Sequence, residues 1–315
     1  MDIRCLIIDE MHPSILPLLD QIGVQVEYLP SIDRKGILAI ISSFHGIIVR
    51  SKIDLDLDFF KHADNLKFIA RAGAGMDRID LEEAKKRNII LINAPEGNSN
   101  ALAEHALSLL LNLMNKIKTS DSEISRKIWR REENRGYELE GKVAAIIGYG
   151  HMGKAFAKKL SLLGCKVIAY DKYLINFSDQ YVQEASLEEV LNKCEILSIH
   201  IPMNTENHQF INQGFFNKIQ KNIWFINTAR GEVLETRALI NALNNGKVIG
   251  AGLDVLENEK LHQLTEQQKK DLRDLLSIDS VILTPHVGGW TYESYERINR
   301  VLVNKILENK KLIQS

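Results

Sequence analysis

Three side chains suited to acid–base chemistry follow strand-like segments in the last third of the sequence. Arg230 comes after IWFIN, Glu259 after VIGAGLDV, and His286 after SVILTP. The guanidinium of Arg230 offers a planar set of donors for a carboxylate or a polarised carbonyl oxygen. The imidazole of His286 can exchange a proton near neutral pH, and a bonded carboxylate from Glu259 would fix its tautomer and favour the imidazolium. This set suits the oxidation of a hydroxy acid, provided that a hydride acceptor binds nearby.

Each of the three residues also has a purely structural explanation. His286 can be a satisfied residue at a strand end, and Arg230 can cap a helix or form a salt bridge. Glu259 can be a solvated acid within the charged run ENEK. These alternatives lose weight when the three residues are considered together beside a nucleotide-binding loop.

That loop is GYGHMG, residues 148–153, which follows the apolar run VAAII and opens an amphipathic helix. Gly148 permits a tight turn, Gly150 lets the backbone approach a pyrophosphate, and Gly153 allows the helix to pack closely on the strand. The free N–H groups and the positive end of the helix dipole would hold the phosphates. A glycine turn in an α/β unit that binds nothing is the structural alternative.

Asp171 supports a dinucleotide at this loop. It ends the next strand-like run, CKVIAYD, about 20 residues beyond the glycines, where an acidic side chain accepts hydrogen bonds from a ribose diol. A carboxylate there repels a 2′-phosphate. The sequence therefore predicts NAD, rather than NADP, as the cofactor.

The residues around these groups alternate between short β-branched runs and amphipathic stretches. One series runs from CLIID to NIILIN in the first third of the chain, and a second begins near residue 142 with KVAAIIG and ends with SVILTP. Apolar strands bounded by helices imply parallel sheets covered on both faces. We therefore predict an α/β protein with two Rossmann-like, doubly wound domains, whose reactive groups lie at the carboxyl ends of the strands.

Two long helical patterns frame the second series. One starts at about Ser99, with Asn98 or Ser99 as its cap, and its high apolar content suits a helix that links the domains and buries surface against a second subunit. The other, residues 291–313, has no strand after it. We expect this terminal helix to return to the first domain.

The composition is that of an ordinary globular protein. The chain has 315 residues, of which 45% are hydrophobic and 26% charged, enough for about two domains. Its 40 Lys+Arg balance 41 Asp+Glu, so the formal charge of −1 gives no overall attraction to nucleic acid or membrane. The three cysteines lack C-x-x-C spacing, which indicates free thiols in a reducing compartment. We find no signal core and no apolar run of ~20 residues, so we expect a cytoplasmic protein, and we expect no metal site.

In combination, the motifs resemble those of the D-isomer-specific 2-hydroxyacid dehydrogenases. The resemblance implies a substrate-binding domain made from residues 1–97 and 287–315, with a NAD-binding domain, residues 98–286, inserted between them and the site in the cleft. It also implies a homodimer or a dimer-based oligomer. The motifs are VRSK, RAGAGMDRID, NAPEGNSNALAEHALSLLL, the glycine loop, HIP, NTARGEV, GLDVLENE and TPHVGGWT.

The resemblance assigns roles residue by residue. Arg230, Glu259 and His286 match the family's catalytic residues, and Asp254 is expected to meet the nicotinamide carboxamide. Backbone N–H groups near Ala74 and Gly75, together with Arg230, are expected to hold the substrate carboxylate. The implied cofactor positions are Gly148, Gly150, His151, Met152, Gly153, Asp171, Ile201, Thr228, Ala229, Asp254, Gly288 and Gly289.

The substrate expectation rests on two arginines. Arg50 and Arg71 match positions that approach a substrate phosphate, although a structural salt bridge explains either one. The resemblance thus implies oxidation of D-3-phosphoglycerate to 3-phosphohydroxypyruvate, the step that begins serine synthesis. The alternatives are a glyoxylate, hydroxypyruvate or D-lactate-type enzyme acting on an unphosphorylated small acid and, from another class, a NAD-sensing corepressor.

The chain departs from the family pattern at several places. Lys260 follows Glu259 where relatives commonly have proline, and the segment between Glu259 and His286 carries an insertion that either caps the cleft or decorates the surface. Trp290 replaces a small residue and is expected to narrow the pocket. Because the chain stops at Ser315 without a serine-binding domain, we expect no feedback inhibition through such a domain.

Overall fold

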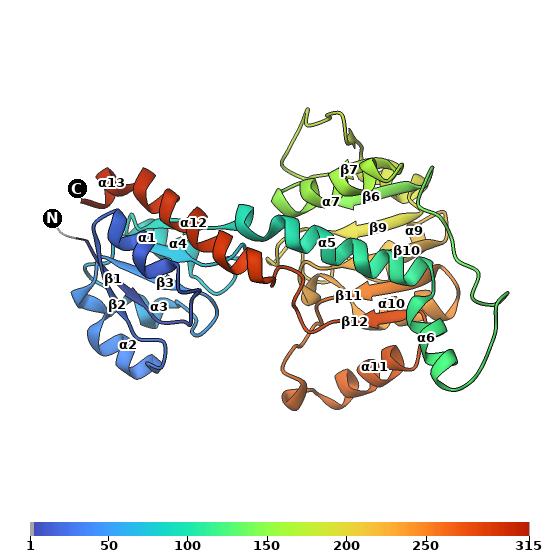
Figure 1. The fold of residues 1–315 in the computed structure, drawn as a ribbon, viewed down its shortest axis with the longest axis horizontal. Coiled ribbons are helices and arrows are strands. Elements are labelled where there is room, and N and C mark those ends of the chain that lie inside the picture. Colours follow the sequence, from blue (N-terminus) through green and yellow to red (C-terminus); the bar gives the residue numbers. More distant parts are fainter. Residues whose placement is uncertain (1–2, 315) are drawn as a thin grey trace. The chain divides into compact units, whose positions relative to one another are not determined.

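The computed structural model describes residues 3–314, which divide into two compact units (Figure 1). We call them the terminal unit, made of the residues up to Ser99 and those from Trp290 onward, and the central unit, Asn100–Gly289. Each unit has its own parallel sheet with helices on both faces.

The terminal unit has a five-stranded sheet in the order β2-β1-β3-β4-β5. Helices α1 and α12 cover one face, and α2, α3 and α4 cover the other. The strands are β1 (Ile3–Ile7), β2 (Val24–Tyr28), β3 (Gly46–Val49), β4 (Phe68–Arg71) and β5 (Ile90–Asn93). The helices are α1 (Ile15–Gln21), α2 (Arg34–Ile40), α3 (Leu57–Phe60), α4 (Leu81–Lys86), α12 (Tyr292–Glu308) and α13 (Lys310–Gln314).

The central unit has a seven-stranded sheet in the order β12-β11-β10-β9-β6-β7-β8. Helices α5 and α7 cover one face, and α8 to α11 cover the other. The strands are β6 (Val143–Ile147), β7 (Lys166–Tyr170), β8 (Gln183–Glu184), β9 (Ile196–Ile199), β10 (Ile223–Asn227), β11 (Val248–Leu253) and β12 (Val281–Leu283). The helices are α5 (Pro95–Met114), α6 (Ile117–Ser125), α7 (His151–Leu162), α8 (Leu187–Lys193), α9 (Gln213–Lys218), α10 (Thr236–Asn244) and α11 (Glu266–Leu276).

The predicted fold class is confirmed, because both sheets pair only parallel strands among the described residues. Strand β10 shows why the pattern was readable: all five of its residues, IWFIN, are buried, as expected for a strand covered on both faces. Strand β8 was not predicted. It is a two-residue, partly exposed strand at the edge of the sheet, so it has no apolar run to reveal it.

The predicted start of the long helix is wrong. Helix α5 begins at Pro95, and Asn98 and Ser99 lie inside it. Proline fits the first helical position because its missing N–H would have no intrahelical partner there. A side chain at Gly97 would come within 2.7 Å of the Ile298 backbone, so the first turn of α5 packs directly against α12 within the terminal unit.

The terminal helical pattern is confirmed as α12, followed by α13. Its buried residues are Ile298, Leu302, Val303 and Ile306, and the helix packs against α1, β4 and β5, so the end of the chain completes the core of the terminal unit. None of the helices in residues 3–314 is long and apolar enough to cross a membrane.

Candidate active site

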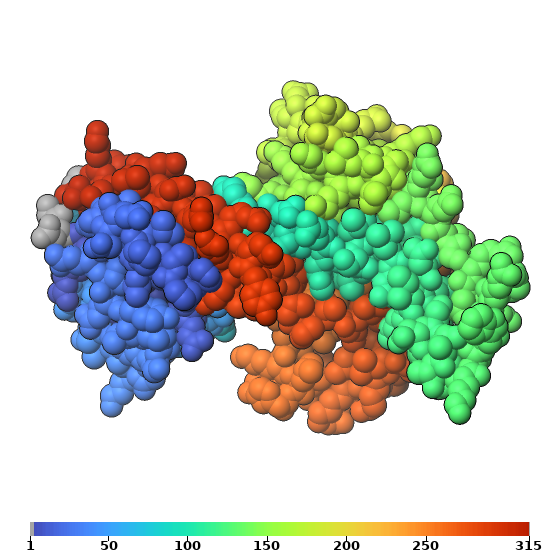
Figure 2. Space-filling view, in the orientation of Figure 1, coloured from blue at the N-terminus to red at the C-terminus, as the bar shows by residue number. Residues whose placement is uncertain are grey.

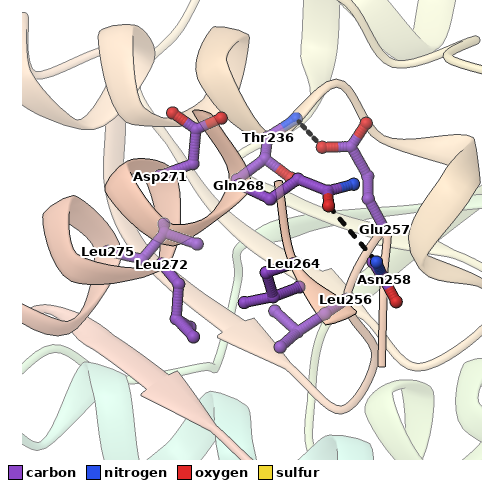
Figure 3. A pocket seen from close by; sticks show the side chains of 9 residues that line it. All are labelled: Thr236, Leu256, Glu257, Asn258, Leu264, Gln268, Asp271, Leu272 and Leu275. Atoms are coloured by element: carbon purple, nitrogen blue, oxygen red, sulfur yellow. Dashed lines mark hydrogen bonds between the residues drawn. The ribbon is translucent and has the colours of Figure 1, made fainter. Parts of the chain in front are cut away.

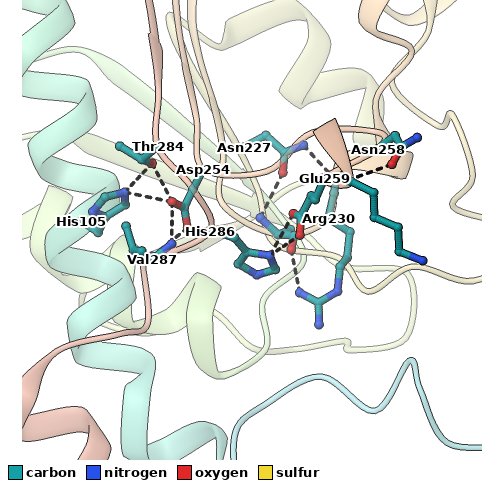
Figure 4. A network of polar contacts seen from close by, with 12 residues as sticks. His105, Asn227, Arg230, Asp254, Asn258, Glu259, Thr284, His286 and Val287 are labelled. Carbon is teal, nitrogen blue, oxygen red and sulfur yellow. Dashed lines mark hydrogen bonds and ion pairs between the residues drawn. The ribbon is translucent and has the colours of Figure 1, made fainter. Parts of the chain in front are cut away.

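His286 follows β12 and forms a hydrogen-bonded pair with Glu259 at the centre of the candidate site (Figure 4). Its ring Nδ1 lies 2.9 and 3.1 Å from the two carboxylate oxygens of Glu259. This hydrogen bond raises the pKa of His286 above its ordinary value, against the opposing effects of burial and of the Arg230 charge. The backbone N–H donates to the carbonyls of Asp254 and Thr284, and these bonds hold His286 at a φ of +56°. Such a left-handed backbone is uncommon outside glycine and concentrates at functional sites.

Asp254 holds the loop that carries the histidine. Its side chain is 1% exposed and accepts hydrogen bonds from the Thr284 hydroxyl at 2.6 Å and the backbone N–H groups of Val287 and Gly288 at 2.9 and 2.7 Å. His105 from α5 contacts Asp254 at 3.3 Å and Thr284 at 2.9 Å. Burial alone would raise the pKa of Asp254, but these donors outweigh it and lower the pKa. The carboxylate is thus ionised and largely occupied within the chain.

Arg230 follows β10 in a loop that contacts both Asn227 and the segment before Glu259. The amide of Asn227 donates to the Arg230 carbonyl at 3.0 Å and accepts from the Ala229 N–H at 3.0 Å. A side chain at Gly231 would lie 1.9 Å from the Leu256 carbonyl oxygen, so this loop packs directly on the segment that leads to Glu259. The structure therefore brings Arg230, Glu259 and His286 together from three successive strand ends (Figure 4).

The glycine loop has the geometry expected of a phosphate-binding turn. Gly148 has a φ of +93°, and a side chain there would lie 2.6 Å from the His200 carbonyl oxygen. A side chain at Gly153 would lie 2.1 Å from the Gly148 carbonyl oxygen, whereas one at Gly150 would meet nothing within 4 Å. Gly150 starts α7 without a side-chain cap. The helix terminus thus opens onto free space, and this arrangement fits a pyrophosphate.

Asp171 directly follows β7 and faces the same loop. One carboxylate oxygen accepts the Tyr149 N–H at 2.8 Å, and the other accepts those of Tyr173 and Leu174 at 2.9 and 3.1 Å. Three backbone bonds therefore orient the carboxylate. A carboxylate has about four acceptor sites, so capacity remains for a ribose hydroxyl.

A buried hydroxyl without a partner adds to the fit of a dinucleotide. Thr228 is 3% exposed, and within residues 3–314 its Oγ1 has no hydrogen-bond partner. Buried polar atoms are normally satisfied, so this one suits a bound molecule. Ile201 lies beside the glycine loop, because a side chain at Gly148 would come within 2.9 Å of it. The remaining predicted cofactor positions are His151 and Met152 at the start of α7, Ala229 beside Arg230, and Gly289 at the end of the central unit.

The two predicted substrate arginines belong to the terminal unit, at the carboxyl ends of neighbouring strands. Arg71 ends β4 and pairs with the last residue of β3, which Arg50 follows. The guanidinium of Arg50 lies 4.0 Å from the Trp290 ring centre and 5.3 Å from that of Tyr295. It also donates to the Glu10 carbonyl at 3.3 Å. Within residues 3–314, Arg50 is therefore stacked on aromatic rings and forms no ion pair.

Arg71 lies over the loop that contains Ala74 and Gly75. A side chain at Gly73 would overlap the Arg71 guanidinium, at 1.5 Å, so the cation rests directly on the loop backbone. The side chain of Asn93 donates to the Ala74 carbonyl at 2.8 Å. In the part of the chain that the structure describes, the backbone N–H groups of Ala74 and Gly75 make no hydrogen bond, so they are available to an anion.

Sequence reasoning missed the residues that support the catalytic candidates. His105 lies on a helix in an apolar stretch, Thr284 is a single residue at a strand end, and Asn227 looked like part of a strand. The detectable signal was their polarity inside apolar runs, because a buried polar side chain requires a partner.

Residues 107–288 match the family model described as "D-isomer specific 2-hydroxyacid dehydrogenase, NAD binding domain". The chain is 30% identical over 310 residues to the D-3-phosphoglycerate dehydrogenase of Archaeoglobus fulgidus, covering 98% of this chain and 57% of that protein. It is 32% identical over 301 residues to the hydroxypyruvate reductase of Thermotoga maritima, covering 96% of this chain and 95% of that one. A solved D-lactate dehydrogenase from Aquifex aeolicus, complexed with NAD and lactic acid, superimposes with a TM-score of 0.83 at 26% identity, covering 99% of this chain and 97% of that one. The chain spans little more than half the length of several matched phosphoglycerate dehydrogenases.

Proposed function

The chain belongs to the D-isomer specific 2-hydroxyacid dehydrogenases, a family of NAD-dependent enzymes, and we propose that it oxidises D-3-phosphoglycerate to 3-phosphohydroxypyruvate. Bound NAD supplies the hydride acceptor, and the chain supplies the proton transfer and the substrate contacts. Under this proposal His286 takes the proton of the substrate hydroxyl as the hydride leaves the carbon that bears this hydroxyl.

The observation that carries the proposal is the His286–Glu259 pair beside Arg230. Glu259 occupies Nδ1, so the neutral ring carries its proton on Nδ1 and presents the lone pair of Nε2 as a base. The raised pKa of His286 also makes the imidazolium available for the reverse reaction. Arg230 is assigned to the substrate oxygen that gains negative character, because its guanidinium is a fixed donor group.

The pair of arginines in the terminal unit supports a phosphorylated substrate, because Arg50 and Arg71 lie at adjacent strand ends, where they can face one dianion. The backbone N–H groups of Ala74 and Gly75 suit the carboxylate of the acid. Several of the matched proteins at 30–32% identity are D-3-phosphoglycerate dehydrogenases, including that of Archaeoglobus fulgidus.

Two observations favour the alternative, reduction of glyoxylate, hydroxypyruvate or another unphosphorylated acid. Arg50 already has aromatic and carbonyl partners within the terminal unit, so a structural role explains it. The Thermotoga hydroxypyruvate reductase also matches this chain over nearly its whole length.

Steady-state kinetics with NAD test the proposal. We expect kcat/KM for 3-phosphoglycerate to exceed that for glycerate, and NAD to be preferred over NADP because Asp171 repels a 2′-phosphate. Equal kcat/KM for the two acids would exclude a phosphate-specific enzyme and support the alternative. NAD binding without NADH formation on a panel of 2-hydroxy acids would instead support a NAD-sensing corepressor.

We also propose a homodimer. Helix α6 and the segment after it expose Ile117, Ile124 and Trp129, which are 53%, 53% and 82% exposed; this green segment lies at the surface in Figure 2. Large exposed apolar side chains of this kind often mark a protein interface. Sedimentation equilibrium tests the proposal, and a monomeric mass at micromolar concentration would contradict it.

A further inference from the structure

The insertion between Glu259 and His286 contacts Asn258, the residue that precedes the candidate catalytic glutamate. Asn258 donates its side-chain N–H to the Gln268 side-chain oxygen at 3.2 Å, and its own side-chain oxygen accepts the Lys260 N–H at 3.0 Å. Gln268 belongs to α11, whose start it also fixes by accepting the Thr265 N–H at 3.0 Å. A chain of hydrogen bonds therefore joins α11 to the backbone directly after Glu259, and Figure 3 shows the bond between Asn258 and Gln268.

The backbone at this point forms a tight turn. The Leu261 N–H donates to the Glu259 carbonyl at 3.1 Å, and Lys260 has φ −84° and ψ 77°, close to an inverse γ-turn. Glu259 lies between Asn258 and Lys260, which are joined by the hydrogen bond from the Lys260 N–H to the Asn258 side chain. A shift of this turn would move the carboxylate away from the Nδ1 of His286.

Helix α11 is itself anchored to the body of the central unit. Arg237 of α10 pairs with Asp271 and, at 2.8 Å, with Asp274 of α11. Leu275 is 1% exposed, and only a small cavity of about 30 Å³ remains between α11 and the Leu256–Asn258 segment (Figure 3). The support that Gln268 provides is therefore continuous with the hydrophobic core.

We propose that Asn258 and Gln268 are positioning residues, through which α11 holds the Glu259 carboxylate against His286. The insertion is then part of the catalytic apparatus rather than a surface decoration. This inference rests on the proposed function, because it assumes that Glu259 and His286 act together.

The primary test is Asn258→Ala in the full-length protein, assayed with NADH and a 2-keto acid such as 3-phosphohydroxypyruvate. Reduction requires protonated His286, whose pKa is raised mainly by the hydrogen bond that its ring donates to Glu259. When Glu259 is less well placed, the pKa of His286 falls toward its ordinary value. The pH above which kcat/KM for reduction declines should therefore be lower than in the wild type. The expected loss at neutral pH is about 2- to 10-fold, the usual net effect of one hydrogen bond. The dissociation constant for NADH should stay unchanged.

Three further variants separate positioning from general damage. Lys260→Pro in the Asn258→Ala protein should restore the pH profile, because the φ of −84° at Lys260 is close to that of proline, and proline has no N–H that needs Asn258. Gln268→Glu should resemble the wild type, since it keeps an oxygen acceptor for Asn258, whereas Gln268→Ala should resemble Asn258→Ala.

Asn245 offers a matched control, because its side chain accepts the Lys247 N–H at 3.0 Å in a similar turn at the end of α10. Asn245→Ala should leave the profile unchanged. An Asn258→Ala profile that superimposes on the wild type, while His286→Ala is inactive, would overturn this inference and leave the proposed function standing. An active His286→Ala would overturn the proposed function itself.

Discussion

The carboxyl ends of the strands carry polar groups in both units, but different contacts hold those groups. In the central unit, His286 bonds to Glu259, and Asp254 accepts side-chain and backbone donors around the same loop. In the terminal unit, Arg50 stacks on Trp290, and the available groups of the Ala74–Gly75 loop are backbone N–H groups. We call the strand ends around Asp254, Glu259 and His286 the central edge, and those around Arg50, Arg71 and the Ala74–Gly75 loop the terminal edge. The central edge is a network of hydrogen bonds that involve side chains and backbone N–H groups. The terminal edge presents two arginine side chains and available backbone N–H groups.

This difference indicates which groups must be held in place before a substrate binds. Proton transfer requires one tautomer and one orientation, and groups held in advance need no reorganisation during the reaction. Anion recognition tolerates a cation on a flexible stem. We therefore expect substitutions in the central edge to change kcat, and those in the terminal edge to change the choice between acids.

The largest expected effect is that of His286→Ala. A general acid–base group typically contributes ~10²–10⁴-fold, so kcat should fall by that factor. The dissociation constant for NAD, measured by calorimetry, should stay near the wild-type value because the glycine loop and Asp171 are untouched. A variant that retains most of its kcat would show that the central edge does not handle the proton.

Glu259→Gln should have a smaller effect, because it removes the charge but keeps the imidazole. The hydrogen bond that the His286 ring donates to Glu259 is the main cause of the raised pKa of His286, so this pKa falls toward its ordinary value in the variant. Oxidation needs the neutral imidazole, and reduction needs the imidazolium. The pH at which kcat/KM rises for oxidation and the pH at which it falls for reduction should therefore both move to lower values.

The same pair links the stability of the fold to pH. Because the folded-state pKa of His286 is raised, the stabilisation by Glu259 is complete below the ordinary histidine pKa and is lost as pH rises through the raised value. Thermal unfolding of the wild type and of Glu259→Gln should therefore converge at alkaline pH. An identical pH dependence of unfolding in the two proteins would mean that the pair is not formed in solution.

The sequence predicted the two sheets because each strand is a short apolar run with helical patterns on both sides. It also indicated Arg230, Glu259 and His286, because reactive side chains that follow strand-like runs can be recognised from the sequence alone. Their supports were not predictable in this way. His105 reaches Thr284 from a helix 179 positions away in the chain, and only packing reveals which polar residue meets which.

Local conformation was also beyond the sequence pattern. The positive φ of His286 follows from its bonds to neighbouring carbonyls and not from its residue type. Helix α5 starts at Pro95 because tertiary packing through Gly97 favours an earlier start than the polar capping residues suggested.

The terminal edge can be tested with Arg71→Ala. A hydrogen bond to a charged group contributes about 1.5–3 kcal/mol, which corresponds to a loss of about 10- to 150-fold. We expect this loss in kcat/KM for 3-phosphoglycerate and little change for glycerate. Arg4→Ala is a suitable control, because Arg4 is exposed near the start of β1 and pairs with Glu27 at 3.7 Å. Equal losses for both acids would assign Arg71 a structural role.

The smallest effect should come from Trp290→Ala, which tests whether the stacking of Arg50 matters for recognition. An exposed cation–π contact contributes about 0.5–1 kcal/mol, so the preference for 3-phosphoglycerate over glycerate should fall by about 2- to 5-fold. Trp290→Phe should keep most of the preference, because phenylalanine still offers a ring to the guanidinium. If Trp290→Ala instead raises kcat/KM for bulkier acids and leaves the phosphate preference intact, Trp290 limits the size of the substrate. The terminal edge would then select substrates by their size rather than by their charge.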